Sequence, residues 1–187
     1  MAINVKRLLA NALIELDKEK PLRKITITDI VTRAGTGRQT FYNHFQDKND
    51  LIYWIYLRTL AGEAKLVNTK GYYAYLVNLH QEAQKISDFL KDACKLDGQN
   101  SLSDALYSQN YRYYRNFIKT HHGEEFLTEE VEYALHFNAA GGSSTFMQWL
   151  LNGAPGTPER QAELTLGCMP QCIKDFIPLY PEDTEED

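Results

Sequence analysis

The chain has 187 residues, of which 43% are hydrophobic and 24% are charged, and its formal net charge is −5. This length suits one compact protein or two small helical domains. No apolar run approaches the roughly 20 residues that a membrane-spanning helix needs, and the first residues lack the apolar block of a secretory signal peptide. We therefore expect a cytoplasmic protein that does not enter a membrane.

The N-terminal part has the pattern of four helices. Apolar residues at helical spacing predict a first helix over about 3–18. A TxxD sequence at 26–29 is a capping box that opens a short second helix, and a glycine-containing break at 35–37 ends it. A third helix is predicted over 38–45, and a DxxD sequence at 47–50 opens a long fourth helix to about residue 66.

Helical periodicity continues after a break at 68–71. The further predicted helices lie near 72–95, 102–119, 128–152 and 158–177, and Pro170 should kink the last of them. Because no run alternates like a β-strand, we expect an all-α fold. We divide it into a helix-turn-helix domain at 1–58, a helical dimerisation and sensing domain at 59–180, and a disordered acidic tail at 181–187.

The charge is unevenly distributed between these parts. Residues 1–58 carry ten Lys or Arg and six Asp or Glu, a net charge of +4, and the remaining residues carry a net charge of −9. A basic domain on an acidic body is typical of a protein whose N-terminal domain binds phosphate. Chance asymmetry would give the same division, so the charge alone leaves both interpretations open.

The second and third helices match a helix-turn-helix, in which two short helices are joined by three residues that include glycine. The inward side is supplied by Ile30, Val31, Ala34, Phe41 and Phe45. The other positions of the third helix carry hydrogen-bonding side chains, and the N-terminal residues of such a helix normally meet base edges. The alternative is a solvated polar face. The predicted DNA contacts on this helix are Arg38, Gln39, Thr40, Tyr42 and His44.

Lys48 is predicted to contact DNA phosphate. It lies just inside the start of its helix, where the helix dipole disfavours a cation. Free backbone N–H groups and a lysine together form a phosphate site. We therefore add Lys48 to the predicted interface.

Three spaced motifs resemble the N-terminal domain of the TetR/AcrR regulators: ITITDIVTRAG at 25–35, TFYNHF at 40–45 and DKNDLI at 47–52. The resemblance implies an Ω-shaped homodimer, two recognition helices in successive major grooves and a ligand cavity in the C-terminal helices. It also implies that Thr26 and Lys48 contact phosphate. Thr36 and Gly37 depart from the usual small apolar turn residue and Ser/Thr cap of the family.

The C-terminal part resembles the dihydroxyacetone-kinase-regulator-like subgroup through YRNF at 114–117, FNAAGG at 137–142 and QWLLNG at 148–153. Small residues at 139–144 lie in the middle of a predicted helix, where each glycine costs roughly 1 kcal/mol relative to alanine. A dimer interface, a tight contact inside the chain or a local kink would each explain them. The predicted dimer contacts are Ala140, Gly141, Ser144, Gly167 and Cys168.

Aromatic residues are dense between 72 and 137, and His80 and several arginines are interleaved with them. A ligand pocket has this mixture of apolar walls and a few polar groups, and an aromatic core is the alternative. Tyr107, Tyr111 and Tyr114 share one helix face. The predicted ligand contacts are Tyr107, Tyr111, Tyr114, Arg115 and Phe137.

These features predict a dimeric one-component transcriptional regulator that binds a pseudo-palindromic operator in double-stranded DNA and responds to an unknown small-molecule effector. The alternative is a regulator whose C-terminal domain binds a partner protein instead. The sequence contains no phosphate loop, nucleophile elbow or paired zinc motif, so we expect no enzyme, cofactor or metal site. Cys94, Cys168 and Cys172 are expected to be reduced, buried small residues.

Overall fold

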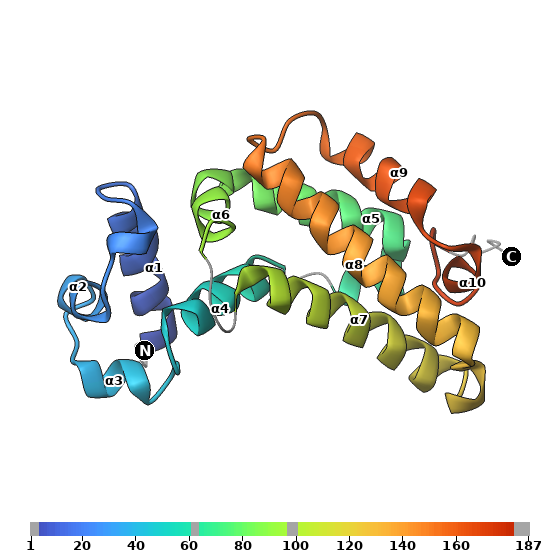
Figure 1. Cartoon of the computed structure of the whole chain (residues 1–187), viewed down its shortest axis with the longest axis horizontal. Coiled ribbons are helices and arrows are strands. Elements are labelled where there is room, and N and C mark those ends of the chain that lie inside the picture. Colours follow the sequence, from blue (N-terminus) through green and yellow to red (C-terminus); the bar gives the residue numbers. More distant parts are fainter. Residues whose placement is uncertain (1–3, 61–63, 97–100, 182–187) are drawn as a thin grey trace, which may run out of the picture.

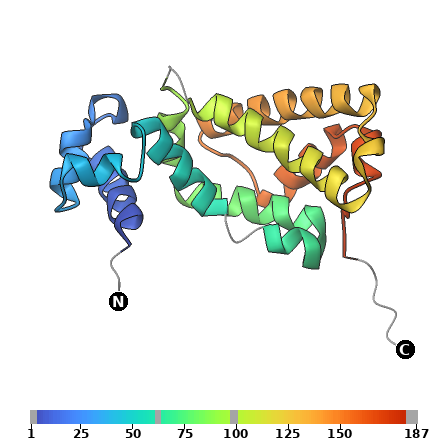
Figure 2. The same cartoon turned by 90° about the horizontal axis from the view of Figure 1, so that it is seen from below.

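The computed structural model describes residues 4–60, 64–96 and 101–181, and the acidic segment 182–187 lies outside this range. Within the described residues, all regular structure is helical, as the periodicity predicts. The N-terminal head and the larger C-terminal body lie at opposite ends of the molecule and are joined through α4 (Figures 1 and 2). None of the helices in the described segments is long and apolar enough to cross a lipid bilayer.

The head consists of α1 (Val5–Asp17), the short 3-10 helix η1 (Leu22–Lys24), α2 (Ile27–Arg33) and α3 (Arg38–Tyr42). Its core contains Leu9, Leu13, Ile30, Phe41 and Leu51, each fully buried. The predicted capping box is confirmed: the Thr26 hydroxyl accepts a hydrogen bond from the Asp29 N–H, and the Asp29 carboxylate accepts one from the Thr26 N–H. Two backbone donors at the start of α2 are thereby satisfied.

The fourth helix is shorter than predicted. α4 (Lys48–Leu60) begins where the DxxD pattern indicates, because Asp47 caps it by accepting from the Asp50 N–H at 2.8 Å. It ends at Leu60 rather than near Leu66, and Ala64 already belongs to α5 (Ala64–Lys85). The predicted break at 68–71 is a kink inside α5 at Gly71, where φ is +79°. A side chain at Gly71 would meet the backbone of Tyr180 at 2.6 Å.

In the described segments 64–96 and 101–181, the body contains seven elements besides α4. They are α5, α6 (Ser87–Ala93), α7 (Leu102–His121), the 3-10 helix η2 (Glu124–Phe126), α8 (Glu129–Leu151), α9 (Pro158–Cys168) and α10 (Gln171–Lys174). The single helix predicted over 72–95 is wrong, because non-helical angles at Ile86 separate α5 from α6. The predicted kink in the last helix is a complete break: Met169 is extended, as residues before proline usually are.

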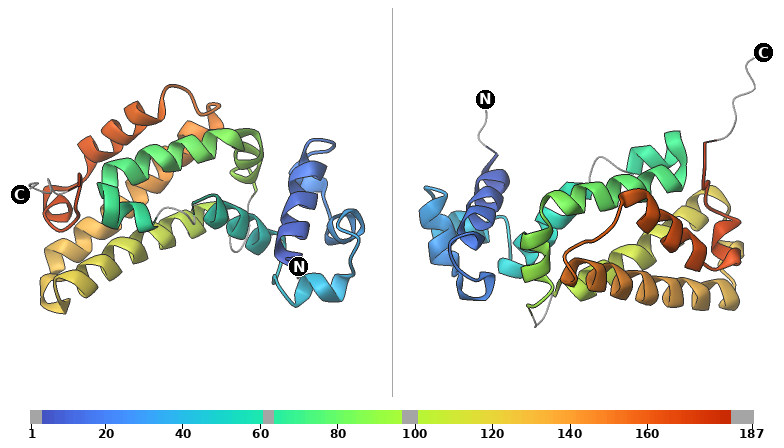
Figure 3. Two further views of the ribbon diagram at one scale, coloured as in Figure 1. Left: turned by 180° about the vertical axis from the view of Figure 1, so that it is seen from behind. Right: turned by 90° about the horizontal axis from the view of Figure 1, so that it is seen from above.

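Two helix pairs organise the body. α7 packs along α8, whereas α9 packs on α5 and makes little contact with α8 (Figure 3). The core between these pairs includes Leu106, Ile118, Leu135 and Leu150, all buried. Because α9 packs on α5 rather than on α8, a space remains between α8 and α9. Helices α5 and α7 form the base of this space.

Candidate nucleic-acid interface and cavity

Two phenylalanines anchor α3 on the head. Phe41 is fully buried and Phe45 is 3% exposed, and their rings lie 5.8 Å apart. Phe45 also packs edge-on against Trp54 of α4 at 6.0 Å. The third helix is shorter than the predicted 38–45: Phe41 lies in α3, and Phe45 lies beyond the end of the helix at Tyr42. Because Phe41 is directed into the head, the opposite side of α3 is turned towards solvent.

The predicted DNA contacts lie on this solvent side. Arg38, Gln39, Tyr42 and His44 are exposed, and Thr40 is half-buried. The Arg38 guanidinium donates to Thr28 Oγ1 at 3.3 Å and to the Tyr42 hydroxyl at 3.4 Å, and Gln39 donates to Asn43 Oδ1 at 3.1 Å. These long, exposed bonds exchange readily with other partners. The arrangement therefore offers a row of hydrogen-bonding groups on a fixed support.

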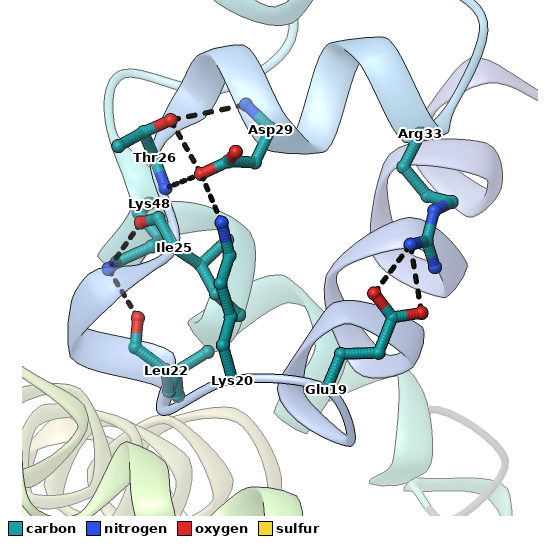
Figure 4. A network of polar contacts seen from close by, with 8 residues as sticks. All are labelled: Glu19, Lys20, Leu22, Ile25, Thr26, Asp29, Arg33 and Lys48. Atoms are coloured by element: carbon teal, nitrogen blue, oxygen red, sulfur yellow. Dashed lines mark hydrogen bonds and ion pairs between the residues drawn. The ribbon is translucent and has the colours of Figure 1, made fainter.

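Thr26 is already engaged at the start of α2 (Figure 4). Its hydroxyl bonds both the Asp29 N–H and the Asp29 carboxylate, which also pairs with Lys20 at 2.9 Å. Lys20, together with the bonds from Thr26, holds the pKa of Asp29 well below its usual range. The predicted phosphate contact is thus part of an ion pair and capping box that fix α2 in the head.

Arg33 fixes the other end of α2. One nitrogen of its guanidinium, Nη2, donates to both carboxylate oxygens of Glu19, at 2.8 and 2.7 Å (Figure 4). The other, Nη1, lies 3.6 Å from Glu15 of α1. The orientation of α2, which supports α3, is therefore set by polar contacts at both of its ends.

Lys48 is directed into the head rather than into the exposed row on α3. Its ammonium group donates to the backbone oxygens of Leu22 and Ile25, at 2.8 and 2.9 Å (Figure 4). The side chain is half-buried, and burial lowers the pKa of the amine. Two of its three hydrogens thereby connect the start of α4 to the loop around η1. No local pattern predicts these carbonyl contacts, because they join residues more than 20 positions apart.

A cavity of about 320 Å³ lies in the body, and its lining comes mainly from α5, α7, α8 and α9. Of the predicted ligand contacts, Tyr114 and Phe137 line it, whereas Tyr107, Tyr111 and Arg115 do not. The difference arises from the direction in which each residue points around the helix axis. The residues of α7 that face the cavity are Leu106, Asn110 and Tyr114, and each of the three excluded residues is one position further along, about 100° around the helix.

Tyr107, Tyr111 and Arg115 instead form hydrogen bonds with polar residues of α8. Glu132 accepts from the Tyr111 hydroxyl and from Arg115, both at 2.8 Å. The Tyr107 hydroxyl bonds His136 Nδ1 at 2.6 Å. These contacts fasten α7 to α8. Sequence reasoning placed His80, Tyr72 and Tyr75 in the aromatic region but did not select them, and all three line the cavity.

The exposed side of α8 is uncharged beyond Glu132. The sequence contains no Asp, Glu, Lys or Arg between Glu132 and Glu159, yet Tyr133 is 75% exposed and Phe137 is 66% exposed. Leu164 on α9 is 46% exposed beside them. The predicted dimer contacts belong to this surface: Ala140, Gly141, Ser144, Gly167 and Cys168 are all exposed.

Contacts inside the chain do not account for the small residues on this surface. A Cβ atom built on Gly141 or Gly167 would meet none of the described residues within 4 Å, and α8 runs without interruption from Glu129 to Leu151. The expectation that all three cysteines are buried is wrong: Cys94 and Cys172 are half-buried, and Cys168 is exposed. This residue is exposed at the edge of the cavity, because α9 packs inward through Ala162 and Leu166.

Comparison with known proteins identifies both parts of the chain. Residues 9–53 match the model of the bacterial regulatory proteins of the tetR family. Residues 72–170 match the model of a transcriptional regulator C-terminal region. The two matches coincide with the head and with most of the body.

Individual relatives are similar over shorter stretches. The HTH-type dhaKLM operon transcriptional activator DhaS of Lactococcus lactis is 32% identical over 72 residues, which is 38% of this chain and 37% of that protein. The HTH-type regulator YvdT of Bacillus subtilis is 50% identical over 44 residues, 24% of this chain and 23% of YvdT. The chain thus matches less than two fifths of either relative's length.

Solved structures share the fold over nearly the whole chain. The dihydroxyacetone kinase operon activator DhaS superposes with a TM-score of 0.60 at 21% identity, and covers 94% of this chain and 99% of its own. A TetR-family regulator from Syntrophomonas wolfei has a TM-score of 0.54 at 17% identity, over 87% and 91% of the two chains.

Proposed function

We propose, since the chain belongs to the TetR family of bacterial regulatory proteins, that it is a homodimeric one-component transcriptional regulator. In this proposal α3 of each copy reads one half of a pseudo-palindromic operator. A small molecule in the cavity of the body changes the affinity for DNA. The observation that carries the proposal is the exposed row of hydrogen-bonding side chains on α3, supported from behind by Phe41 and Phe45.

The proposed base contacts come from the start of α3. Arg38 can pair bidentately with guanine, and Gln39 can pair bidentately with adenine. Thr40, Tyr42 and His44 supply further groove or backbone contacts. A recognition helix of this kind places its N-terminal residues against base edges in the major groove.

Thr26 and Lys48 are the proposed phosphate contacts. Both are already hydrogen-bonded within the head: Thr26 would have to turn its single hydroxyl hydrogen from Asp29 to a phosphate oxygen, whereas Lys48 could keep its two bonds. Lys48 has one hydrogen left after its bonds to Leu22 and Ile25. A positively charged group in this position still releases a counterion from DNA on binding.

The surface of α8 and α9 around Phe137 and Leu164 is the proposed dimer interface; its α8 part is uncharged beyond Glu132, whereas α9 adds the exposed Glu159, Arg160 and Glu163. It combines exposed apolar side chains such as Phe137 and Leu164 with small residues such as Ala140 and Gly167. Small residues allow two helices to approach closely, and a two-fold contact would pair this surface with its own copy. A dimer supplies the second recognition helix that a pseudo-palindromic site requires.

The cavity favours a small-molecule effector over a partner protein. Its volume of about 320 Å³ lies within the range of ligand-binding sites. Aromatic side chains and a few uncharged polar groups line it, as is usual for such sites.

In vitro selection from random duplexes followed by gel shift tests the proposal. We expect a site with two half-sites, one helical turn apart or a multiple of this, bound by two copies of the chain. Binding of a monomer to a single half-site would contradict it. Gln46→Ala, at an exposed residue just beyond the proposed contacts, is a matched control that should bind like the parent.

A further inference from the structure

The first feature that restricts the ligand is the charge of the cavity. Among the described residues that line it, none is Lys, Arg, Asp or Glu. An ionised ligand entering these walls would lose its hydration without meeting an opposite charge, which is strongly unfavourable. The lining therefore selects against anions, including phosphorylated compounds. A primary ammonium ion is disfavoured as well, because attraction to the aromatic ring faces offsets only part of its lost hydration.

The second feature is the aromatic character of the walls. On one side, the rings of Tyr72 and Tyr75 are stacked with centroids 5.1 Å apart. On the other side, Phe146 and Trp149 from α8 lie 5.5 Å apart. Flat apolar surfaces pack best against other rings, through stacked or edge-to-face contacts. The volume corresponds to about ten water molecules at about 30 Å³ each, which is enough for a molecule of one or two rings.

Most polar groups of the lining are already paired with one another. The hydroxyl groups of Tyr72 and Tyr114 share a hydrogen bond. Asn110 donates to Ser143 Oγ at 3.1 Å. Thr165 donates to the backbone oxygen of Gln161 at 2.9 Å. These groups shape the wall and have less capacity left to anchor a ligand.

His80 differs from these groups. It lies on α5, is 4% exposed and lines the cavity. Its Nδ1 is 2.8 Å from the backbone oxygen of Leu76, and because a carbonyl oxygen only accepts, Nδ1 must carry the hydrogen. Burial lowers the pKa of His80, so the ring is neutral at pH 7. Nε2 is then an unprotonated acceptor, and within the described residues it has no hydrogen-bond donor.

The surroundings of His80 fix its orientation. The ring packs edge-on against Trp149 at 4.9 Å and against Phe146 at 5.6 Å. Together with the bond to Leu76, these contacts hold the imidazole in one position between the aromatic walls. A donor group on a flat ligand would meet Nε2 without rearrangement of the protein, which favours binding.

We propose that this cavity binds an uncharged, ring-containing molecule whose hydroxyl or N–H group donates a hydrogen bond to Nε2 of His80. The regulatory meaning of this site rests on the proposed function given above, whereas the binding itself does not. The walls supply the affinity through apolar contact, and His80 supplies the orientation.

Equilibrium binding of a matched set of naphthalene compounds to the full chain at pH 7.5 tests this ligand class. The set is 2-naphthol, naphthalene, the anion 2-naphthoate and the cation 2-naphthylmethylammonium. We expect 2-naphthol to bind about 3–10-fold more tightly than naphthalene, the usual effect of one hydrogen bond, and at least 10-fold more tightly than either ion. Equal or tighter binding of an ion would overturn the proposal.

Two substitutions of His80 test its proposed role as the hydrogen-bond acceptor for the ligand. His80→Asn keeps a donor near Leu76 but removes the acceptor at the Nε2 position, whereas His80→Gln places an acceptor close to that position. We expect His80→Asn to abolish the preference for 2-naphthol over naphthalene and His80→Gln to keep part of it. An unchanged preference in a folded His80→Asn variant would overturn the role of His80. If that variant does not fold, the preference of the parent protein for 2-naphthol over naphthalene still decides whether the proposal stands.

Operator binding separates this proposal from the proposed function. If 2-naphthol shows the expected binding pattern but leaves DNA affinity unchanged, the ligand class is supported and sensing of this compound fails. If the charged compounds bind more tightly while the chain still binds a palindromic operator, the ligand class fails and the DNA-binding function stands.

Discussion

Replacing Lys48 with methionine should destabilise the head. The substitution keeps the length and apolar stem of the side chain but removes the donor of two hydrogen bonds, to Leu22 and Ile25. Hydrogen bonds to a charged group contribute about 1.5–3 kcal/mol each when buried. Because Lys48 is only half-buried, water can reach part of the site, and we expect a loss of about 2 kcal/mol in total.

Thermal unfolding followed by circular dichroism measures this loss. For a chain of this size, about 2 kcal/mol corresponds to a decrease of about 4–8 °C in Tm. Lys24→Met, at an exposed lysine in η1, is the matched control and should melt like the parent. If Lys48→Met also melted like the parent, the two carbonyl contacts would contribute nothing measurable and this reasoning would be refuted.

The same variant tests the proposed phosphate contact. A lost phosphate contact lowers the slope of log affinity against log salt concentration by about one unit. An unchanged slope together with a lower Tm would restrict Lys48 to a structural role.

Three further predictions concern other parts of the molecule. Arg38→Ala should relax base preference at one position by about 1–3 kcal/mol, measured by selection; uniform weakening on all sequences would contradict base contact. Ala140→Glu should convert the proposed dimer to a folded monomer in sedimentation experiments, because it would place like charges across the proposed two-fold interface; Asn116→Glu, at an exposed position of α7, is its control. Burial and Asp92 raise the pKa of Asp17 from 3.8 to about 6, so ionised Asp17 destabilises the folded state as pH rises through this window. Asp17→Asn should therefore be about 1 kcal/mol more stable above pH 6, after allowance for solvent screening, and should lose this advantage below pH 4; a pH-independent difference would contradict this.

Local sequence signals predicted the head well. The capping box at Thr26 and Asp29 needs only residues three positions apart, and the structure contains it. The burial of Phe41 and Phe45 was predicted correctly, although Phe45 lies beyond the end of α3 at Tyr42 and not on the helix itself. Where neighbouring residues determine the structure, the sequence pattern was sufficient.

The cavity could not be predicted in the same way, because it depends on which helices pack together. The aromatic density identified the right region, but the cavity face of α7 passes through Asn110 and Tyr114 rather than through Tyr111. Choosing between adjacent helix faces requires knowing where α8 lies. Likewise, nothing local to 158–168 shows that α9 packs on α5. The space that holds the cavity exists only because α9 packs on α5.

Helix α4 physically connects the two sites. Near its start, Lys48 bonds the loop around η1, and Trp54 packs on Phe45 behind the recognition helix. Tyr56, two residues beyond Trp54, lines the cavity and packs against Phe146 at 6.4 Å. A ligand that displaced Tyr56 would therefore act on the same rigid helix that positions α3. Because a ligand shifts an equilibrium only by its differential affinity for the two arrangements, an effector of the proposed kind would have to prefer one position of α4, and operator DNA would then change its affinity by the same factor.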